Sequence, residues 1–227
     1  MNEHEKIFSR RQMLKSTIGF GGLAIAGGSV FAQQQERMTT PEVDLGPFYP
    51  VLKPLDRDAD LTKLKGSKGV AAGTIIHVAG RLLDAKGKPI SGAKIEIWQA
   101  NTHGRYAHKG DTNNAPLDPN FQGYAVIKTD SQGRYRFKTI KPGAYPISAT
   151  TQRTPHIHFD IEGSHDRLVS QMFFPNEPLN EKDGIFMNLH KYSAKVTDAV
   201  TAKVLPPTKE IEKNALLFNW DIVLSNG

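Results

Sequence analysis

The fold is decided by residues 74–99, which read TIIHVAGRLLDAKGKPISGAKIEIWQ. The first part of this stretch alternates between two sets of side chains, Ile76, Val78, Gly80 and Leu82 on one parity and Ile75, His77, Ala79 and Arg81 on the other. A period of two is typical of a β-strand, because successive side chains point to opposite faces of a sheet. Residues 84–87 read DAKG, which is a turn signal, and residues 93–99 alternate again. The stretch therefore predicts two strands separated by a turn.

The same alternation recurs toward the end of the chain. It predicts strands at residues 123–129, 134–140, 156–161, 168–174 and 216–224, whereas residues 194–204 fit either a strand or a helix. Short strands at regular spacing with turn residues between them favour a β-sandwich. We therefore expect an all-β fold, with a β-sandwich domain at residues 74–227, long loops, and an irregular N-terminal segment punctuated by proline at residues 33–73.

One loop in this pattern is longer than a simple connection between two strands requires. Residues 101–122 carry Tyr106, two histidines and several Asp and Asn side chains. Loops of this length inside a compact domain are uncommon and are usually functional. We therefore expect the functional site to draw on this loop, and we expect a second loop-rich region at residues 175–190.

Composition narrows the classes of function. The 227 residues are 38% hydrophobic and 23% charged, which suits one domain with a real core and excludes both a disordered polyelectrolyte and a multi-span membrane protein. The chain has no cysteine, which excludes disulfide scaffolds, thiolate metal sites, Fe–S clusters and cysteine nucleophiles. Any metal ion must therefore be held by histidine, tyrosine or carboxylate side chains.

The N-terminus predicts export. Ser9-Arg10-Arg11 precedes a run from Ser16 to Ala32 that is uncharged and rich in glycine, an arrangement typical of a twin-arginine signal peptide. We place cleavage after Ala32, which gives a signal at residues 1–32 and a periplasmic or secreted protein. A basic anchor helix that stays attached is the alternative. The twin-arginine route carries folded proteins, which hints at a metal or cofactor acquired before export.

The charge of the exported chain is modest. Removal of residues 1–32 leaves 25 basic and 21 acidic side chains, a net charge of +4. An excess of this size does not argue for nucleic acid binding. We therefore expect no nucleic-acid partner and no membrane association after the signal is removed, and a homo-oligomer is compatible with the sequence.

The sharpest chemical motif is the His-Ile-His of residues 156–158. In a strand the two imidazoles share one face while the isoleucine between them points to the other, so the pair can chelate a metal. For an isolated motif the alternative is two ordinary histidines. Here Tyr106 and Tyr145 lie in loops fixed by glycine and proline that can converge on this strand, and Arg153 precedes the motif by three residues.

These residues stand in a chain that resembles the intradiol ring-cleaving dioxygenases, most closely those of the protocatechuate 3,4-dioxygenase β-chain type. The resemblance covers most of residues 41–190, in the family's order and at nearly the family's spacing. Its motifs are GPFY (46–49), GAKIEIWQAN (92–101), GRY (104–106), LDPNF (117–121), TD and GRY (129–130 and 133–135), PGAYP (142–146), RTPHIHF (153–159) and QMFF (171–174).

The resemblance implies a β-sandwich catalytic core with a mononuclear non-haem Fe(III), acting on a catechol-type aromatic substrate with O₂. It places the two tyrosinate and two histidine ligands at Tyr106, Tyr145, His156 and His158. It also implies catalytic roles for Tyr145, Arg153 and Gln171, with the arginine stabilising charge on the substrate ring and the glutamine near the metal. Ile147 stands where relatives often carry an aromatic side chain, so we expect the substrate pocket to differ there.

Elementary charge balance supports these implied ligands. Free tyrosine has a pKa of about 10, so ionising it at neutral pH costs roughly 4 kcal/mol, which a ferric ion readily supplies. Two phenolates leave Fe(III) with a formal charge of +1. A catecholate dianion would bring the charge to −1 unless one tyrosine leaves, so one tyrosine should be displaceable and act as a base. The resemblance assigns that part to Tyr145, and the product is a muconate-type dicarboxylic acid.

A non-catalytic binding module is the alternative interpretation of the sequence. The DAKGKPISGA of residues 84–93 is common in exported β-sandwich modules of transthyretin type, which bind surfaces or sugars. Iron in the purified protein separates the two interpretations. Outside the predicted site, we expect Trp98 and Trp220 in the core, and we expect ordinary roles for the remaining histidines, although His108 lies two residues from Tyr106 and can neighbour the metal.

Overall fold

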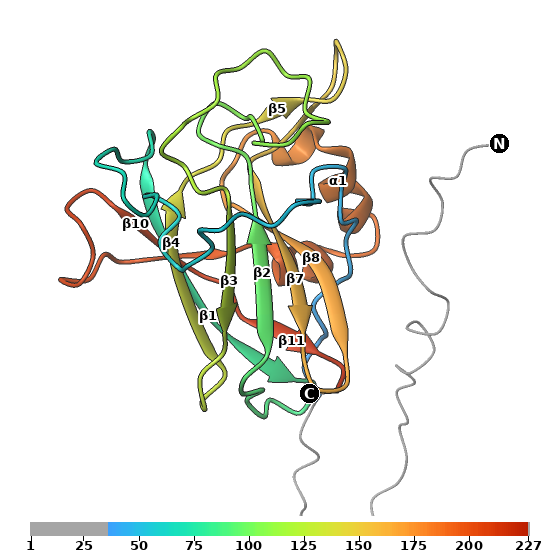
Figure 1. Ribbon diagram of the computed structural model, residues 1–227. Helices are drawn as coiled ribbons and strands as arrows, with labels where there is room; N and C mark the ends of the chain where they lie inside the picture. Colours follow the sequence, from blue (N-terminus) through green and yellow to red (C-terminus); the bar gives the residue numbers. More distant parts are fainter. Residues whose placement is uncertain (1–35, 227) are drawn as a thin grey trace, which may run out of the picture.

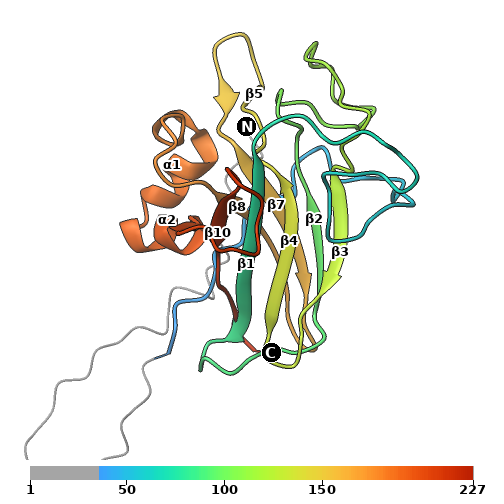
Figure 2. The ribbon, with the colours of Figure 1, turned by 90° about the vertical axis from the view of Figure 1, so that its left-hand side faces the viewer.

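The computed structural model describes residues 36–226, which fold as a β-sandwich flanked by short helices (Figures 1 and 2). The first sheet contains β1 (Ile75–Asp84), β4 (Arg134–Ile140), β9 (Lys203–Leu205), β10 (Leu216–Asn219) and β11 (Ile222–Leu224). The second sheet contains β2 (Lys94–Trp98), β3 (Tyr124–Lys128), β7 (His156–Glu162) and β8 (Arg167–Phe173). A two-stranded hairpin of β5 (Tyr145–Pro146) and β6 (Gln152–Arg153) stands at one end of the sandwich (Figure 1). The all-β prediction is confirmed.

The first sheet is organised around β1. This strand pairs antiparallel with β4 along one side and parallel with β10 and then β11 along the other. The sequence predicted one final strand at residues 216–224, but the ladder breaks at Trp220 and Asp221, where the side chain of Asp221 accepts the Arg81 amide at 3.0 Å. One predicted strand is therefore two, because a side chain replaces the backbone as hydrogen-bond partner at this point.

The second sheet separates a core face from an outer face. Its strands are all antiparallel in the order β3-β2-β7-β8. The side chains that fill the core from β2 and β7 are Ile95, Ile97, Ile157, Phe159 and Ile161, which are all fully buried. The opposite parity therefore points to the outer face, where the register aligns Tyr124, Trp98, His158 and Gln171 in one row across the four strands.

The helices form where the sequence predicted a loop or left the structure open. The region 175–190 contains the 3₁₀ turn η2 (Asn180–Lys182) and the helix α1 (Gly184–His190), and residues 194–204 contain the helix α2 (Ala194–Val200) and the start of β9. Phe173 of β8 packs against Phe186 of α1, with 5.1 Å between the ring centroids. These helices therefore cover the side of the sandwich next to β8 (Figure 2).

Two expectations concern membranes and export. Within residues 36–226 no helix has the length and apolar character needed to cross a bilayer. The twin-arginine motif and the expected cleavage point after Ala32 lie outside the described residues.

The contact between β1 and the 220–221 break predicts a stability effect at Gly80. A Cβ atom at this position would lie 1.9 Å from the carbonyl oxygen of Trp220, which the Tyr135 hydroxyl also contacts. We expect Gly80→Ala to lower the free energy of unfolding by about 1–3 kcal/mol, because backbone atoms must move to admit the methyl group. Urea unfolding followed by tryptophan fluorescence measures this change.

Gly184→Ala is the matched control for this substitution. Nothing lies within 4 Å of the Cβ that it would add, so its unfolding midpoint should stay at or above that of the parent chain. Equal effects of the two substitutions would contradict the packing role of Gly80.

Candidate metal centre

The outer face of the second sheet presents two histidines side by side. Because β7 alternates, His156 and His158 point together away from the core, and their Nε2 atoms lie 3.2 Å apart. The Thr154 carbonyl can only accept, so His156 Nδ1 must donate the 2.6 Å hydrogen bond that joins them. This fixes the tautomer of His156 and leaves its Nε2 lone pair free to bind a metal.

Two tyrosines close the site, Tyr106 from the long loop and Tyr145 from the first position of β5. The Tyr145 hydroxyl lies 3.5 Å from His156 Nε2, and the rings of Tyr106 and Tyr145 meet edge to face with 5.4 Å between their centroids. All four side chains are at least 96% buried. The structure thus brings together the four residues that the sequence predicted as metal ligands.

A close approach of two loops sets the positions of these tyrosines. Gly104 has a φ of +76°, and a Cβ atom there would lie 2.0 Å from the Ala144 carbonyl oxygen. The Gly143 amide donates to the Asn101 carbonyl at 2.9 Å, which holds the same two loops together. The long loop that carries Tyr106 is therefore locked onto the loop that carries Tyr145, and only glycine fits at the crossing.

The four donor groups are electrically neutral as the protein holds them. Burial raises the pKa of Tyr106 well above its ordinary value, and the nearby Tyr145 raises it further. Burial also raises the pKa of Tyr145, although the charge of Arg153 opposes the shift. For His156 and His158, burial lowers the pKa well below the ordinary value. The imidazoles are thus in the form that binds metals, and the phenols need a cation to ionise them.

Two buried polar atoms of the predicted ligands have no hydrogen-bond partner among residues 36–226, the Tyr106 hydroxyl and Nδ1 of His158. A buried hydroxyl without a partner costs about 1–3 kcal/mol, so native proteins rarely leave one. A metal ion bound among the four side chains would satisfy this oxygen, so the residues present fit the group that the sequence predicted.

Arg153 is held rigidly at the edge of the site. Its Nε donates to Asp183 Oδ2 at 2.7 Å, and one terminal nitrogen donates to Gln171 Oε1 at 2.6 Å. Gln171 in turn donates to the Asp44 carbonyl at 2.8 Å. Arg153 is also the cross-strand partner of Tyr145 in the β5–β6 hairpin. The guanidinium therefore sits at a fixed place beside the tyrosine.

Sequence reasoning missed Asp183. Its side chain is fully buried, pairs with Arg153, accepts the Thr154 amide at 2.9 Å, and caps α1 by accepting the amides of Ile185 and Phe186. An aspartate directly before a run of apolar residues is a recognisable N-cap signal. The signal was lost because the region was interpreted as loop.

Trp98 corrects another expectation. The sequence placed both tryptophans in the core, and Trp220 is there, in contact with Phe159. Trp98 instead stacks on His158, with 4.8 Å between the ring centroids and 7° between the planes. The β2 alternation puts Trp98 on the outer face, which is buried by loops rather than by the opposite sheet. Its burial therefore belongs to the site and not to the sandwich core.

His108 lies near the site, as the sequence allowed, and Ile147 lies at the surface. The His108 ring packs on Phe48 at 5.8 Å between centroids, and Phe48 packs on Tyr106 at 4.7 Å. His108 is thus linked to the site through one intervening ring. Ile147 follows β5 and is 59% exposed.

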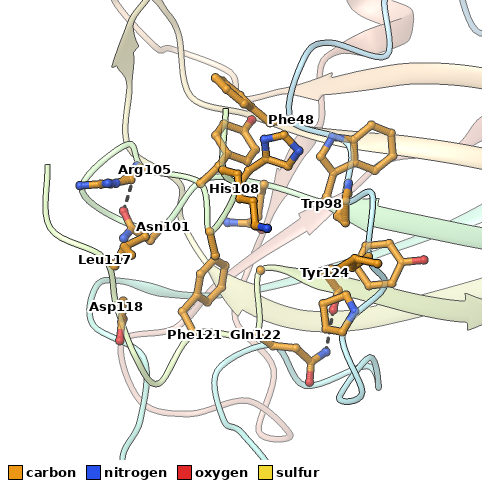
Figure 3. A pocket seen from close by; sticks show the side chains of 18 of the residues that line it. Phe48, Trp98, Asn101, Arg105, His108, Leu117, Asp118, Phe121, Gln122 and Tyr124 are labelled. Carbon is orange, nitrogen blue, oxygen red and sulfur yellow. Dashed lines mark hydrogen bonds between the residues drawn. The ribbon is translucent and has the colours of Figure 1, made fainter. Parts of the chain in front are cut away.

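A cavity of about 350 Å³ adjoins the site (Figure 3). It shares Tyr106 and Trp98 with the candidate metal centre, and its other walls come from residues 48–54 and from the loop that ends at Tyr124. Small-molecule pockets typically measure about 300–1,000 Å³. The geometry thus combines four neutral metal donors, a fixed cation and an adjacent pocket of ligand size.

Comparison with known proteins decides the family. A family model described as a dioxygenase matches residues 45–226. The protocatechuate 3,4-dioxygenase beta chain of Burkholderia cepacia is 44% identical over 185 residues, which are 80% of this chain and 73% of that protein. The hydroxyquinol 1,2-dioxygenase of Rhizobium sp. is 32% identical over 48% of this chain and 40% of that protein.

The chain belongs to the intradiol ring-cleavage dioxygenase family. Two solved structures agree at 25% identity and a TM-score of 0.62 each. One is the dioxygenase domain of a carbohydrate-binding fusion from Streptomyces sp. SirexAA-E, with 84% of this chain and 100% of that chain covered. The other is catechol 1,2-dioxygenase from Acinetobacter sp. ADP1, with 82% and 63% covered.

Family membership confirms the enzyme class that the sequence predicted, an intradiol dioxygenase of the protocatechuate and catechol type. It also implies a non-haem iron. The alternative of a non-catalytic module loses its support. The roles of individual side chains stay predictions.

The buried pair between Arg153 and Asp183 predicts a large stability effect. Asp183→Asn keeps the shape of the side chain but leaves the Arg153 charge buried without its counter-ion. We expect the free energy of unfolding to fall by about 3–5 kcal/mol. Urea unfolding of the iron-loaded protein measures the loss.

Glu162→Gln serves as the matched control, because Glu162 pairs with Lys94 at 2.6 Å while its side chain is 58% exposed. Exposed pairs contribute little, so its unfolding midpoint should hardly move. An Asp183→Asn protein as stable as this control would show that the buried pair does not anchor the site.

Proposed function

We propose that this protein is a mononuclear Fe(III) intradiol dioxygenase that cleaves a catechol-type ring with O₂ to a muconate-type dicarboxylic acid. Tyr106, Tyr145, His156 and His158 would hold the iron. The observation that carries the proposal is the buried Tyr106 hydroxyl, which has no hydrogen-bond partner among residues 36–226 and converges with a second phenol and two imidazole nitrogens.

The chemistry of the donor set favours ferric iron. Phenolates are hard anionic oxygen ligands, which stabilise the higher oxidation state. The common ferrous alternative uses two histidines and a carboxylate. Among residues 36–226 no group of three or more His, Asp or Glu side chains is arranged to hold a metal. When bound, ferric iron would supply Lewis acidity that ionises the phenols and makes a chelated diol electron-rich toward O₂.

Tyr145 would act as the base for a substrate hydroxyl. Its hydroxyl oxygen lies beside His156 Nε2, and the charge of Arg153 favours the phenolate form against the cost of burial. As a phenolate it can take a proton at its oxygen and turn away as a neutral phenol. Tyr106 has its backbone amide bound to Asp111 at 2.7 Å, which suits a side chain that stays in place.

Arg153 would stabilise negative charge on the substrate ring. Asp183 and Gln171 fix its guanidinium, so no reorganisation is needed when the charge develops. Fixed charges of this kind in a buried site are typically worth 10²–10³-fold in turnover. Gln171 would act through Arg153, since its amide oxygen accepts from the guanidinium.

The division of labour between the tyrosines tests the proposed function. We expect Tyr145→Phe to retain iron and to lose about 100-fold in kcat/KM on catechol, for want of a base. Anaerobic addition of catechol to the parent protein should remove the Tyr145 tyrosinate signal in resonance Raman spectra and leave the Tyr106 signal. Tyr106→Phe should lose the signal that persists.

Tyr135→Phe is the matched control, because Tyr135 is buried in the core and its hydroxyl bonds the Trp220 carbonyl. It should leave the Raman spectrum unchanged. Purified protein that binds no iron, or a spectrum in which Tyr106 is the residue released, would refute the assignment.

We also propose that the protein is exported through the twin-arginine route and works in the periplasm or outside the cell. The support is the pair Arg10-Arg11 ahead of an uncharged run that ends at Ala32. Replacing both arginines by lysine should retain the full-length precursor in the cytoplasm, because the route reads the arginine pair. Cell fractionation and immunoblotting measure this, and normal processing of the double variant would contradict it.

A further inference from the structure

Most of the cavity beside the candidate metal centre is not needed to hold the ring that would be cleaved. It contacts Tyr106 and Trp98, but Tyr145, His156 and His158 do not line it. It therefore adjoins the site at Tyr106 and at the Trp98 ring, which stacks on His158, and extends from there away from the other three predicted ligands. A diol held at the metal centre would leave this space for whatever else the substrate carries.

The polar side chains of the cavity wall direct their hydrogen bonds elsewhere. Gln99 donates to the carbonyls of Ala100 and Ile140 and accepts from Thr139. The Gln122 amide nitrogen donates to backbone carbonyls, while its Oε1 is buried without a partner among the described residues. The Tyr124 hydroxyl donates to Glu96. The rest of the wall is mainly the surface of Phe48, Leu117 and Phe121 and of the two aromatic rings Trp98 and Tyr124, with the His108 ring beside them (Figure 3).

The charged side chains of the wall are of both signs, Arg105, Lys109 and Asp118, and Lys109 is exposed to solvent. One terminal nitrogen of Arg105 donates to the Ala115 carbonyl at 2.7 Å, whereas its Nε is buried without a partner among the described residues. The side chain extends away from Phe121 and Tyr124 in Figure 3. Asp118 lies in the same wall and would repel a carboxylate near Arg105. The indole Nε1 of Trp98 is a buried donor with no partner among the described residues, and one uncharged oxygen would satisfy it.

The mouth of the cavity is apolar and exposed. Val51, Leu52 and Leu117 line the cavity and are 83%, 80% and 53% exposed. The segment that carries the first two is fastened at both ends to one buried carboxylate, because Tyr49 and Lys53 both bond Glu96 Oε2, at 2.7 and 2.6 Å. Apolar side chains held in water beside a cavity mark a binding site for an apolar group.

We propose that this cavity binds a large, uncharged, mainly apolar substituent on the catechol ring, so that the preferred substrates are 4-alkyl or 4-aryl catechols and not simple or carboxylated ones. The inference rests on the proposed ring cleavage for its reaction, and on the cavity walls for its substrate class. Val51 and Leu52 close over the substituent from the mouth, and Phe48 and Phe121 contact it from inside.

The test measures kcat/KM of the iron-loaded protein on catechol and on 4-methyl-, 4-propyl- and 4-hexylcatechol. Burying one methylene is worth about 0.8 kcal/mol, so kcat/KM should rise about fourfold for each of the first methylenes. The charged partner of 4-propylcatechol is 3-(3,4-dihydroxyphenyl)propanoate, which has the same chain length. It should be the poorer substrate by at least tenfold, because its carboxylate would be desolvated.

Leu52→Asp and Leu55→Asp make a matched pair of variants. Both side chains are exposed, at 80% and 101%, but only Leu52 lines the cavity. Leu52→Asp should lower the ratio of kcat/KM for 4-hexylcatechol over catechol at least tenfold, and Leu55→Asp should leave that ratio unchanged. Calorimetric titration with 4-hexylphenol, which lacks the second hydroxyl and cannot be cleaved, should show the same contrast in Kd without turnover.

The outcomes separate the two proposals. Turnover of catechol with no dependence on chain length, or a preference for the carboxylated analogue, would overturn the inference about the cavity and leave the proposed function intact. Binding of 4-hexylphenol that does not compete with catechol would also overturn it, because the site would then be separate from the substrate. No turnover of any catechol by iron-loaded protein would overturn the proposed function, and the phenol titration would then decide the cavity alone.

Discussion

The pleat of β7 is the constraint on which the rest of the structure depends. Its odd-numbered residues Ile157, Phe159 and Ile161 fill the sandwich core, so the even-numbered His156 and His158 must point outward together. A slip of one residue in pairing would turn the imidazoles into the sandwich core and the core side chains to the outer face, so hydrophobic burial fixes the histidine pair in place. Everything else in the site is brought to that pair by neighbouring strands or by loops. The row that includes Trp98 and Gln171 follows from the same register.

Burial then gives these groups their chemistry. Water is excluded from the two phenols and two imidazoles, so none of them is charged until a cation arrives, and the Tyr106 hydroxyl is left without a partner among the described residues. The charged guanidinium of Arg153 would also be unfavourable in this buried environment without a counter-ion. Asp183 compensates its charge and at the same time caps α1, so one carboxylate connects the helix that covers β8 to the edge of the site. The same side chain, that of Asp183, therefore both compensates the buried charge and positions α1.

The loops close one side of the candidate metal centre and leave a cavity beside it. Gly104 allows the Tyr106 loop to meet the Tyr145 loop at contact distance, which closes one side of the centre. On the other side the long loop and residues 48–54 stand apart and leave a cavity with apolar walls. These walls are aromatic inside and aliphatic at the mouth.

The sequence by itself determined the periodic part of this protein. Most strand positions and the outward-facing histidine pair follow from local spacing, because the alternation of side chains along a strand needs no knowledge of partners. The motifs around Tyr106, Tyr145 and Arg153 are found in the sequence through its resemblance to the family. Only the tertiary structure decided what depends on contacts between distant segments. Asp183 stands thirty residues after Arg153 and its role exists only once α1 docks. The sequence predicted Trp98 in the sandwich core, but Trp98 lies on the outer face, stacked on His158. Its burial there comes from loops, whose positions the local pattern of residues cannot predict. The break at Trp220 and the cavity beside Tyr106 likewise depend on contacts between strands and loops that are distant in the sequence. The spacing of residues within one segment therefore cannot predict them.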